Sequence, residues 1–171
     1  MRHEYSLALR VSSALILLLL PVDIFYLLLL KPTLYASAFF LGSYNPIMTA
    51  DSLIINNIAL KFIPACIASL AYLLLILLIL LTKDLSFKKS FGLFLLGSLI
   101  IFAANIIRID ALIYVYFEYG RDLFNQLHLF IWDILSSVFV ASMWIFFVYI
   151  FNIKSIPVYN DLIALYRMAK R

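Results

Sequence analysis

The chain has 171 residues, of which 66% are hydrophobic and 13% are charged, and its formal net charge is +4. Soluble domains carry about 25% charged residues, so this composition excludes an ordinary soluble protein and predicts a single multi-pass membrane domain over residues 1–171. The basic residues lie next to apolar segments, which indicates membrane orientation and not nucleic-acid binding, and a single cysteine excludes an internal disulfide.

The first helix is predicted at roughly residues 8–30, after an N-terminus that carries Arg2 and Arg10. Its apolar run, Val11–Leu30, is long enough to cross a hydrocarbon layer of about 30 Å. The small residues at 36–38 also resemble a signal-peptide cleavage site, but the apolar run is longer than that of a usual signal peptide. We therefore favour an uncleaved first helix.

Residues 31–63 are expected to form the one sizeable non-helical region. Lys31-Pro32 is predicted to end the first helix, because proline disrupts helical hydrogen bonding. Ser52–Ile55 and Ile58–Phe62 predict two strands joined by Asn56-Asn57, because asparagine tolerates positive φ. Alternating apolar residues predict that the second strand buries one face. Since an unpaired strand cannot lie in lipid, this β-hairpin is expected on the membrane surface.

Three further helices are predicted at residues 64–82, 90–117 and 124–151, followed by a basic tail at 152–171. Pro64 suits a first helical position, because its missing N–H would have no partner there. The expected fold is therefore an all-α membrane protein with about four transmembrane helices. A short extracytoplasmic β-hairpin would lie between the first helix and the second.

The distribution of basic residues predicts the orientation of these helices. The N-terminus, the loop at 82–90 and the tail hold two, three and four of the 13 Lys and Arg residues. The positive-inside rule therefore places these segments and both termini in the cytoplasm. Tyr114, Tyr116 and Tyr119 would form an aromatic belt at the opposite boundary.

Three residues with reactive or charged side chains fall on the external side of this topology. Cys66 begins the second predicted helix, Arg108 lies near the end of the third, and His128 lies near the start of the fourth. Arg108 is 18 residues beyond Ser90, about 27 Å of helix, which places it just inside the outer boundary. An arginine at a membrane helix centre costs about 2.5–3.5 kcal/mol, so such a residue indicates a functional site.

The chemistry of the three side chains fits one reaction. A cysteine at a helix N-terminus lies at the positive end of the helix dipole, which favours the thiolate. Histidine transfers protons near neutral pH, and arginine supplies fixed donors for an oxyanion. Asn105 and Ser98 continue a polar stripe on the helix of Arg108, and we expect Asn105 to hold the Arg108 guanidinium in place.

Each of these residues also has a structural explanation. A lone cysteine on an apolar helix is usually an inert small hydrophobe, and a histidine at a membrane interface is often only amphipathic. Arg108 is also compatible with an ion pair to Asp110 or Glu118, or with contact to lipid headgroups. Three other charged residues are weaker candidates for a functional role: Asp23, Arg121 and Asp133.

Three segments together resemble the exosortase/archaeosortase family of membrane-embedded cysteine transpeptidases. They are Ala65-Cys66 after a surface hairpin, the sequence N-I-I-R-I at Asn105–Ile109, and His128 at the start of the last helix. The resemblance spans roughly residues 52–144, and its most specific part is the N-x-x-R-I element. The family's cysteine is commonly followed by a small residue and a glycine, whereas Ile67-Ala68 follow here.

The resemblance implies a role for each residue: Cys66 as nucleophile, Arg108 as transition-state stabiliser and His128 as acid and base. It implies cleavage of C-terminal hydrophobic sorting signals from exported proteins at the external face of the cell membrane, and transfer to an acceptor such as a lipid. No cofactor or metal is expected, because the sequence contains no phosphate loop or ligand-spaced His/Cys set.

A second hypothesis is a small non-catalytic membrane protein, such as the substrate-binding subunit of a transporter or an assembly factor. Arg108 and His128 would then line a ligand pocket or pair with a partner subunit, and Cys66 would be buried and unreactive.

Overall fold

The computed structural model describes residues 2–19, 23–83, 85–131 and 136–153. These residues form six α-helices, two 3-10 turns and a small antiparallel sheet, so the chain is mainly helical. The helices are α1 (Arg2–Leu19), α2 (Asp23–Phe40), α3 (Ser69–Leu81), α4 (Phe87–Tyr119), α5 (Arg121–Phe130) and α6 (Ser136–Ile150). The 3-10 turns are η1 (Gly42–Tyr44) and η2 (Pro64–Ile67).

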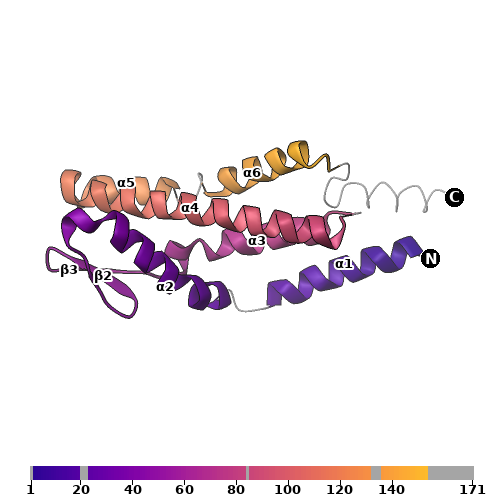
Figure 1. Ribbon diagram of the computed structural model, residues 1–171, viewed down its shortest axis with the longest axis horizontal. Helices are drawn as coiled ribbons and strands as arrows, with labels where there is room; N and C mark the ends of the chain where they lie inside the picture. Colours follow the sequence, from indigo (N-terminus) through magenta and orange to yellow (C-terminus); the bar gives the residue numbers. More distant parts are fainter. Residues whose placement is uncertain (1, 20–22, 84, 132–135, 154–171) are drawn as a thin grey trace.

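The helices run along the long axis of an elongated molecule (Figure 1). The sheet lies at one end, and the N-terminus of α1 lies at the other. α1 and α2 follow one another toward the sheet end, α3 runs back, and α4 extends the length of the bundle to the sheet end. α5 folds back along α4, and α6 continues in the same direction.

The predicted first helix at residues 8–30 is wrong in its extent. α1 ends at Leu19 and α2 begins at Asp23, whose carboxylate lies in a first helical turn and is favoured by the helix dipole. The predicted stop at Lys31-Pro32 is also wrong, because Pro32 lies inside α2. The turn after Pro32 buries Thr33, Leu34 and Ser37, and this packing offsets the hydrogen bond that proline removes.

The other predicted helices differ from the structure at their ends. The helix predicted at 64–82 begins later, because η2 precedes α3 and Ala68 between them adopts a left-handed conformation with φ 57°. The helix predicted at 90–117 is confirmed and is longer, and the side chain of Ser86 caps it by accepting from the Lys89 N–H at 3.4 Å. The helix predicted at 124–151 appears as α5 and α6. Asp133 and the tail beyond Ile153 lie outside the described residues.

The predicted hairpin is confirmed as β2 (Ser52–Ile55) and β3 (Ile58–Lys61). Ile55 pairs with Ile58, and Asn56 and Asn57 between them have φ 50° and 63°, as a two-residue hairpin turn requires. A further strand, β1 (Ile47–Met48), pairs with β2 and makes it the central strand.

Both strands of the hairpin turn one face toward the core, and β2 is the more deeply buried of the two. Leu53 and Ile55 of β2 are fully buried, whereas β3 is mostly exposed. The predicted alternation is confirmed in part: Leu60 packs against buried residues and Phe62, two residues further on, is 3% exposed, whereas Ile58 beside the turn is exposed.

Two separate hydrophobic cores stabilise the molecule. The bundle core lies between α3, α4 and α6 and consists of Tyr72, Leu75, Ile79, Leu93, Ile101, Val140, Met143, Trp144, Phe147 and Ile153. The sheet-end core joins α2, the sheet, η2 and α4 and consists of Leu34, Leu41, Leu53, Ile55, Phe62, Ile67, Ile109 and Ile113. α4 contributes to both cores, and η2 lies where they meet.

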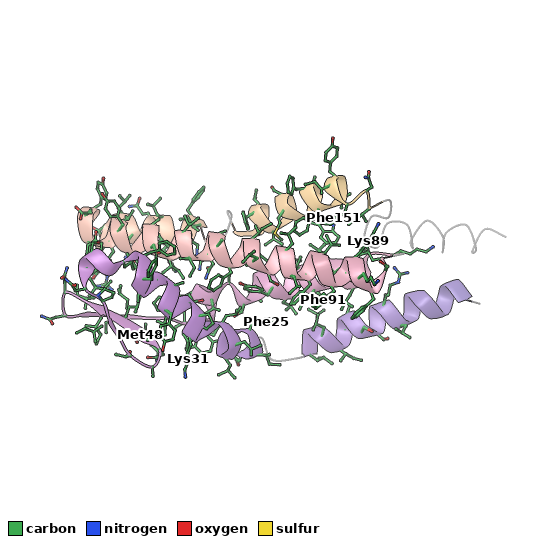
Figure 2. The ribbon with its side chains drawn as sticks, viewed as in Figure 1. Phe25, Lys31, Met48, Lys89, Phe91 and Phe151 are labelled. Atoms are coloured by element: carbon green, nitrogen blue, oxygen red, sulfur yellow. The ribbon has the colours of Figure 1, made fainter. Side chains whose placement is uncertain are left out.

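The outer faces of the helices are apolar. α2 and α4 are each long and apolar enough to cross a membrane, and three shorter apolar helices occur at Leu9–Leu19, Ser69–Leu81 and Val138–Ile150. Large apolar side chains such as Leu27, Leu99 and Ile145 are 73%, 65% and 68% exposed. Figure 2 shows mainly carbon-rich side chains projecting from the bundle, with Lys89 near the end opposite the sheet. So much exposed apolar surface is typical of contact with lipid.

Candidate active site

Cys66 lies in η2, the 3-10 turn that joins the sheet to α3. Pro64 begins this turn, and Ile67 anchors it in the sheet-end core with a side chain that is only 1% exposed. The Cys66 side chain is partly exposed and packs against the same core. The prediction that Cys66 lies in the first turn of the α-helix is wrong, because α3 begins three residues later at Ser69.

Side chains from α3 and α4 bond three consecutive backbone carbonyls of this turn. Arg108 Nη2 donates to the Ala65 and Cys66 carbonyl oxygens at 3.2 and 3.1 Å, and Asn105 Nδ2 donates to the Cys66 carbonyl at 2.9 Å. Ser69 Oγ donates to the Pro64 carbonyl at 3.3 Å. The turn that carries the thiol is therefore fixed from outside its own backbone.

Asn105 and Arg108 act on this turn together, because residues three apart share one face of a helix. The prediction that Asn105 holds the Arg108 guanidinium is wrong, because the described interactions join both side chains to the Cys66 carbonyl instead. The N-x-x-R element thus positions the backbone of the cysteine.

Arg108 keeps hydrogen-bonding capacity beyond these contacts. A guanidinium has five N–H donors, and Arg108 Nε is buried with no partner among the described residues. The ion pairs considered for Arg108 are not among the described contacts, and Glu118 accepts a hydrogen bond from the Tyr44 hydroxyl instead, at 3.5 Å. A desolvated cation without a carboxylate partner in the described part of the chain is costly, which is typical of a functional position.

An oxyanion formed at Cys66 would need donors from outside the turn. The backbone N–H of Cys66 already donates to the Ile63 carbonyl at 2.8 Å, so it is not free to bond a developing negative charge. Arg108 carries the fixed positive charge nearest this turn and interacts electrostatically with the Cys66 thiol. The arrangement therefore makes the guanidinium the suitable oxyanion donor.

His128 lies in the last turn of α5, and not in the first turn of a long final helix as predicted. Its ring stacks on Phe124 one turn earlier, with ring centroids 5.4 Å apart, and Phe124 in turn meets the edge of Tyr116 on α4. Burial lowers the pKa of His128 below its ordinary value of 6.5, and the positive charge of Arg108 lowers that pKa further. The imidazole is therefore mainly neutral at pH 7 and able to accept a proton.

The structure brings Cys66, Asn105 and Arg108 into direct contact and places His128 within electrostatic range of Arg108. The described interactions include no hydrogen bond between the Cys66 thiol and the His128 imidazole.

A cavity of about 120 Å³ lies beside these residues, between α3, α4 and α6. Ala68, just before α3, and Ala71 of α3 form one side, Phe139 forms part of the α6 side, and Asn105 and Arg108 line the cavity from α4. Its walls are otherwise apolar.

Sequence reasoning missed three residues that shape the site. Ala68 gives no sequence signal, because alanine rarely adopts a left-handed conformation. Ser69 was missed because the helix was predicted to begin at Pro64. The stacking of Phe124 on His128 had a signal, since residues four apart on a helix are neighbours.

Within the described residues, no group of three or more His, Cys, Asp or Glu side chains is placed to hold a metal ion. Comparison with models of protein families gives no match, and comparison with curated proteins and with solved structures gives no significant match. A function for this chain therefore has to follow from the chemistry of the residues themselves.

Proposed function

We propose that this chain is a membrane-embedded cysteine transpeptidase of the exosortase/archaeosortase type. It would cleave C-terminal hydrophobic sorting signals from exported proteins at the external membrane face. The observation that carries the proposal is the contact of Arg108 with the Cys66 turn, 42 residues away in sequence. Arg108 is also the residue whose charge acts on His128, so one guanidinium links the thiol and the imidazole.

The proposed topology has four membrane spans with both termini in the cytoplasm. Residues 90–107 of α4 contain no charged side chain, and at 1.5 Å per residue these 18 residues span about 27 Å of hydrocarbon. Lys88 and Lys89 precede this interval and Arg108 follows it. Figure 1 places the start of α4 at the same end as the N-terminus of α1, and the sheet at the opposite end. The positive-inside rule then makes the sheet end external.

The proposed reaction has two steps. His128 accepts the proton of the Cys66 thiol, and the thiolate attacks the substrate carbonyl carbon to form a tetrahedral oxyanion that Arg108 stabilises. The C–N bond then breaks, His128 returns the proton to the departing amine, and a thioester remains on Cys66. An acceptor such as an amine-bearing lipid attacks the thioester carbonyl, gives up a proton and releases the thiol.

Substitution of the nucleophile tests the proposal directly. In cells that produce the Cys66→Ala variant, substrate proteins should keep their C-terminal hydrophobic segments and accumulate in the membrane fraction. Mass spectrometry of C-terminal peptides measures this accumulation. Asp51→Asn, in the turn between β1 and β2 and outside the site, is the control and should leave processing unchanged. Processing by Cys66→Ala at the wild-type rate would exclude Cys66 as the nucleophile.

Arg108→Lys should also slow processing, because lysine cannot bond two carbonyls and an oxyanion with one planar fork. The chain has one cysteine, so a hydroxylamine-sensitive acyl adduct on the intact protein can be assigned to Cys66 without mapping. Absence of any such adduct during turnover would contradict the thioester step.

One observation favours the second hypothesis, a non-catalytic ligand-binding membrane protein. The cavity is lined by Asn105 and Arg108, whereas Cys66 is not among its lining residues. A membrane-impermeant maleimide applied from outside separates the two functions. Rapid labelling of Cys66 supports an accessible nucleophile, and complete protection in the folded protein supports a buried, unreactive thiol.

A further inference from the structure

β3 is an edge strand, and no strand of the described chain pairs with its outer side. The pairing with β2 continues one residue past β3, because the Phe62 N–H donates to the Asp51 carbonyl at 2.9 Å. In an antiparallel pair, successive residues of a strand direct their backbone groups alternately toward the partner and away from it. Phe62 bonds toward β2, so its odd-numbered neighbours direct their backbone groups to the open side. These neighbours are Ala59, Lys61 and Ile63.

These three residues form an open edge, residues 59–63, which we call the β3 edge. All three are exposed, and Ile63 has φ −103° and ψ 167°, so the extended backbone continues up to the start of η2. Within the described part of the chain, no hydrogen bond outside the sheet involves the backbone of Ala59 or Lys61, or the N–H of Ile63. The β3 edge therefore presents three N–H donors and two carbonyl acceptors in the alternation that a further strand requires.

The β3 edge leads directly into the turn of the proposed nucleophile. The Ile63 carbonyl accepts from the Cys66 N–H at 2.8 Å, so the last residue of the edge and the backbone of Cys66 are neighbours. Tyr26 of α2 fixes this junction, because its hydroxyl donates to the Phe62 carbonyl at 3.0 Å. A chain that lies along the edge therefore arrives beside Cys66.

We propose that the β3 edge binds the segment of the substrate before the scissile bond as an added β-strand. Carbonyls of the peptide accept from the N–H groups of Ala59, Lys61 and Ile63, and its N–H groups donate to the carbonyls of Ala59 and Lys61. Strand addition gives affinity through main-chain hydrogen bonds, so it requires an extended segment and depends little on side-chain identity. This inference rests on the proposed function and names the conformation in which that enzyme takes its substrate.

The added strand runs parallel to β3. β3 runs from the Asn56-Asn57 turn toward η2, and α3 then continues along the bundle (Figure 1). In the proposed topology the substrate passes from its exported domain outside to its hydrophobic segment in the membrane, so its chain runs the same way. Each extended residue advances about 3.3 Å, so the peptide beyond Ile63 reaches Cys66 within a few residues.

A peptide explains the position of the β3 edge better than a second copy of the chain does. Two copies joined through this edge by a two-fold axis would pair in antiparallel fashion and would cover the approach to Cys66. Pairing between copies also gives no reason for the edge to end at the nucleophile.

Binding is tested on the full-length Cys66→Ala variant in lipid nanodiscs. The probe has about six alternating Thr and Val residues, followed by a leucine-rich helix of about 20 residues that anchors it in the same membrane at high local concentration. The matched control probe has the same side chains and anchor, but every amide nitrogen of the extended part is methylated. NMR measures amide hydrogen exchange in protein labelled with ¹⁵N-alanine and ¹⁵N-lysine.

We expect the probe to slow exchange at Ala59 and Lys61 by about ten-fold or more, and the methylated probe to leave it unchanged. With ¹⁵N-asparagine and ¹⁵N-isoleucine labels, a nitroxide at the N-terminus of the probe should broaden the signal of Asn57 more than that of Ile63. The reverse order would show antiparallel pairing and overturn the proposed direction.

Two variants of Lys61 form a matched pair in cells. Lys61→Pro and Lys61→Thr both lose the ion pair with Asp51, whose atoms lie 3.3 Å apart, but only proline removes an N–H from the open side. Proline is tolerated at such a position of an edge strand, because the pairing with β2 does not use this N–H. We expect substrate processing to be about five-fold or more slower in Lys61→Pro than in Lys61→Thr. If Lys61→Pro does not fold, Ala59→Pro and Ala59→Thr replace the pair.

Slow exchange with neither probe, or equal slowing by both, would overturn strand addition. Slow exchange at Ala59 and Lys61 without a probe, increasing with the number of copies per nanodisc, would assign the edge to a second copy and also overturn it. The exchange measurement does not depend on catalysis. Equal processing by the two Lys61 variants with intact dependence on Cys66 would overturn the β3 edge alone, whereas Cys66-independent processing would overturn the enzyme.

Discussion

Arg108 has two tasks that a single point charge could not perform. Its Nη2 atom fixes the Ala65 and Cys66 carbonyls, and its charge acts on both the thiol and the imidazole. The planar guanidinium allows both, because its donors point in several fixed directions. The position of the Cys66 turn and the electrostatic environment of the thiol and imidazole therefore both depend on Arg108.

The electrostatic effect of Arg108 changes the pKa of His128. Burial lowers this pKa below 6.5 and Arg108 lowers it further, so the folded state binds fewer protons than the unfolded state just below pH 6.5. The stability that neutral His128 contributes is present above about pH 6.5 and is lost as the pH falls through the lowered pKa.

We predict that Arg108→Gln raises the pKa of His128 toward 6.5, because a positive neighbour is removed while burial remains. Arg108→Lys keeps the positive charge and should therefore raise the pKa of His128 less than Arg108→Gln does. Imidazole proton NMR titration measures the change, and His128→Gln distinguishes the signal from that of His3, the other histidine. An identical His128 titration in wild type and Arg108→Gln would show that the two groups do not interact.

At the scale of single elements, η2 is held in a conformation that its sequence does not favour. Ala68 closes the turn with φ 57° and ψ 34°, a left-handed conformation that glycine adopts freely and alanine does not. The contacts of Arg108, Asn105 and Ser69 with the turn account for its persistence here.

We predict that Ala68→Gly stabilises the protein by about 0.5–1 kcal/mol, because relief of left-handed strain exceeds the added chain entropy. Ala103→Gly, in the exposed interior of α4, is the control and should destabilise by about 1 kcal/mol. Thermal unfolding in detergent measures both. A loss of stability in Ala68→Gly similar to that of the control would mean that no strain is stored at this position.

Elements with a strong local signal could be predicted from the sequence. The Asn56-Asn57 hairpin was predicted because two residues that tolerate positive φ connect two apolar runs. Arg108 contacts the Cys66 turn, so the predicted proximity of these two residues is confirmed, whereas their common membrane face stays a prediction. The hairpin was predictable from the short-range spacing of its residues, and the importance of Arg108 was predictable because it is a charge in an apolar helix.

Elements set by tertiary contacts could not be predicted. α2 continues past Pro32 because its later residues pack in the sheet-end core, and that packing is not visible in the local sequence. α5 ends at Phe130 with no proline or glycine nearby to signal the end, so His128, predicted near the start of a long helix, lies in the last turn of a short one. The carbonyl contacts of Asn105 depend on the approach of α4 to η2 and have no sequence signature.

At the scale of the whole molecule, the site lies between two hydrophobic cores that are formed by different sets of elements. The bundle core joins α3, α4 and α6, and the sheet-end core joins the sheet to α2 and α4. Gly97 allows the helices of the bundle to approach closely, because a Cβ there would lie 2.7 Å from Leu75 and 3.1 Å from Phe147. Both neighbours are fully buried and have little room to move.

We predict that Gly97→Ala destabilises the bundle by about 1–3 kcal/mol through overpacking. Gly92→Ala is the control on the same helix: its Cβ would meet nothing within 4 Å, so it should gain about 0.5–1 kcal/mol from helix propensity. Thermal unfolding in detergent compares the two. Equal stability of both variants would contradict close packing of α4 against α3 and α6.

In the proposed topology, the charge-free interval of α4 makes the environment of Arg108 depend on the thickness of the bilayer. Its length of about 27 Å over 18 residues is fixed by the helix, whereas bilayers range in thickness from about 27 to about 33 Å. In the proposed topology a thin bilayer leaves the guanidinium at the water boundary, and a thick bilayer draws it into hydrocarbon or thins locally around it. Hydrophobic mismatch would thus set the dielectric constant around the Cys66 thiol. The thickness of the bilayer would then change the reactivity of this thiol, although no lipid atom takes part in the proposed reaction.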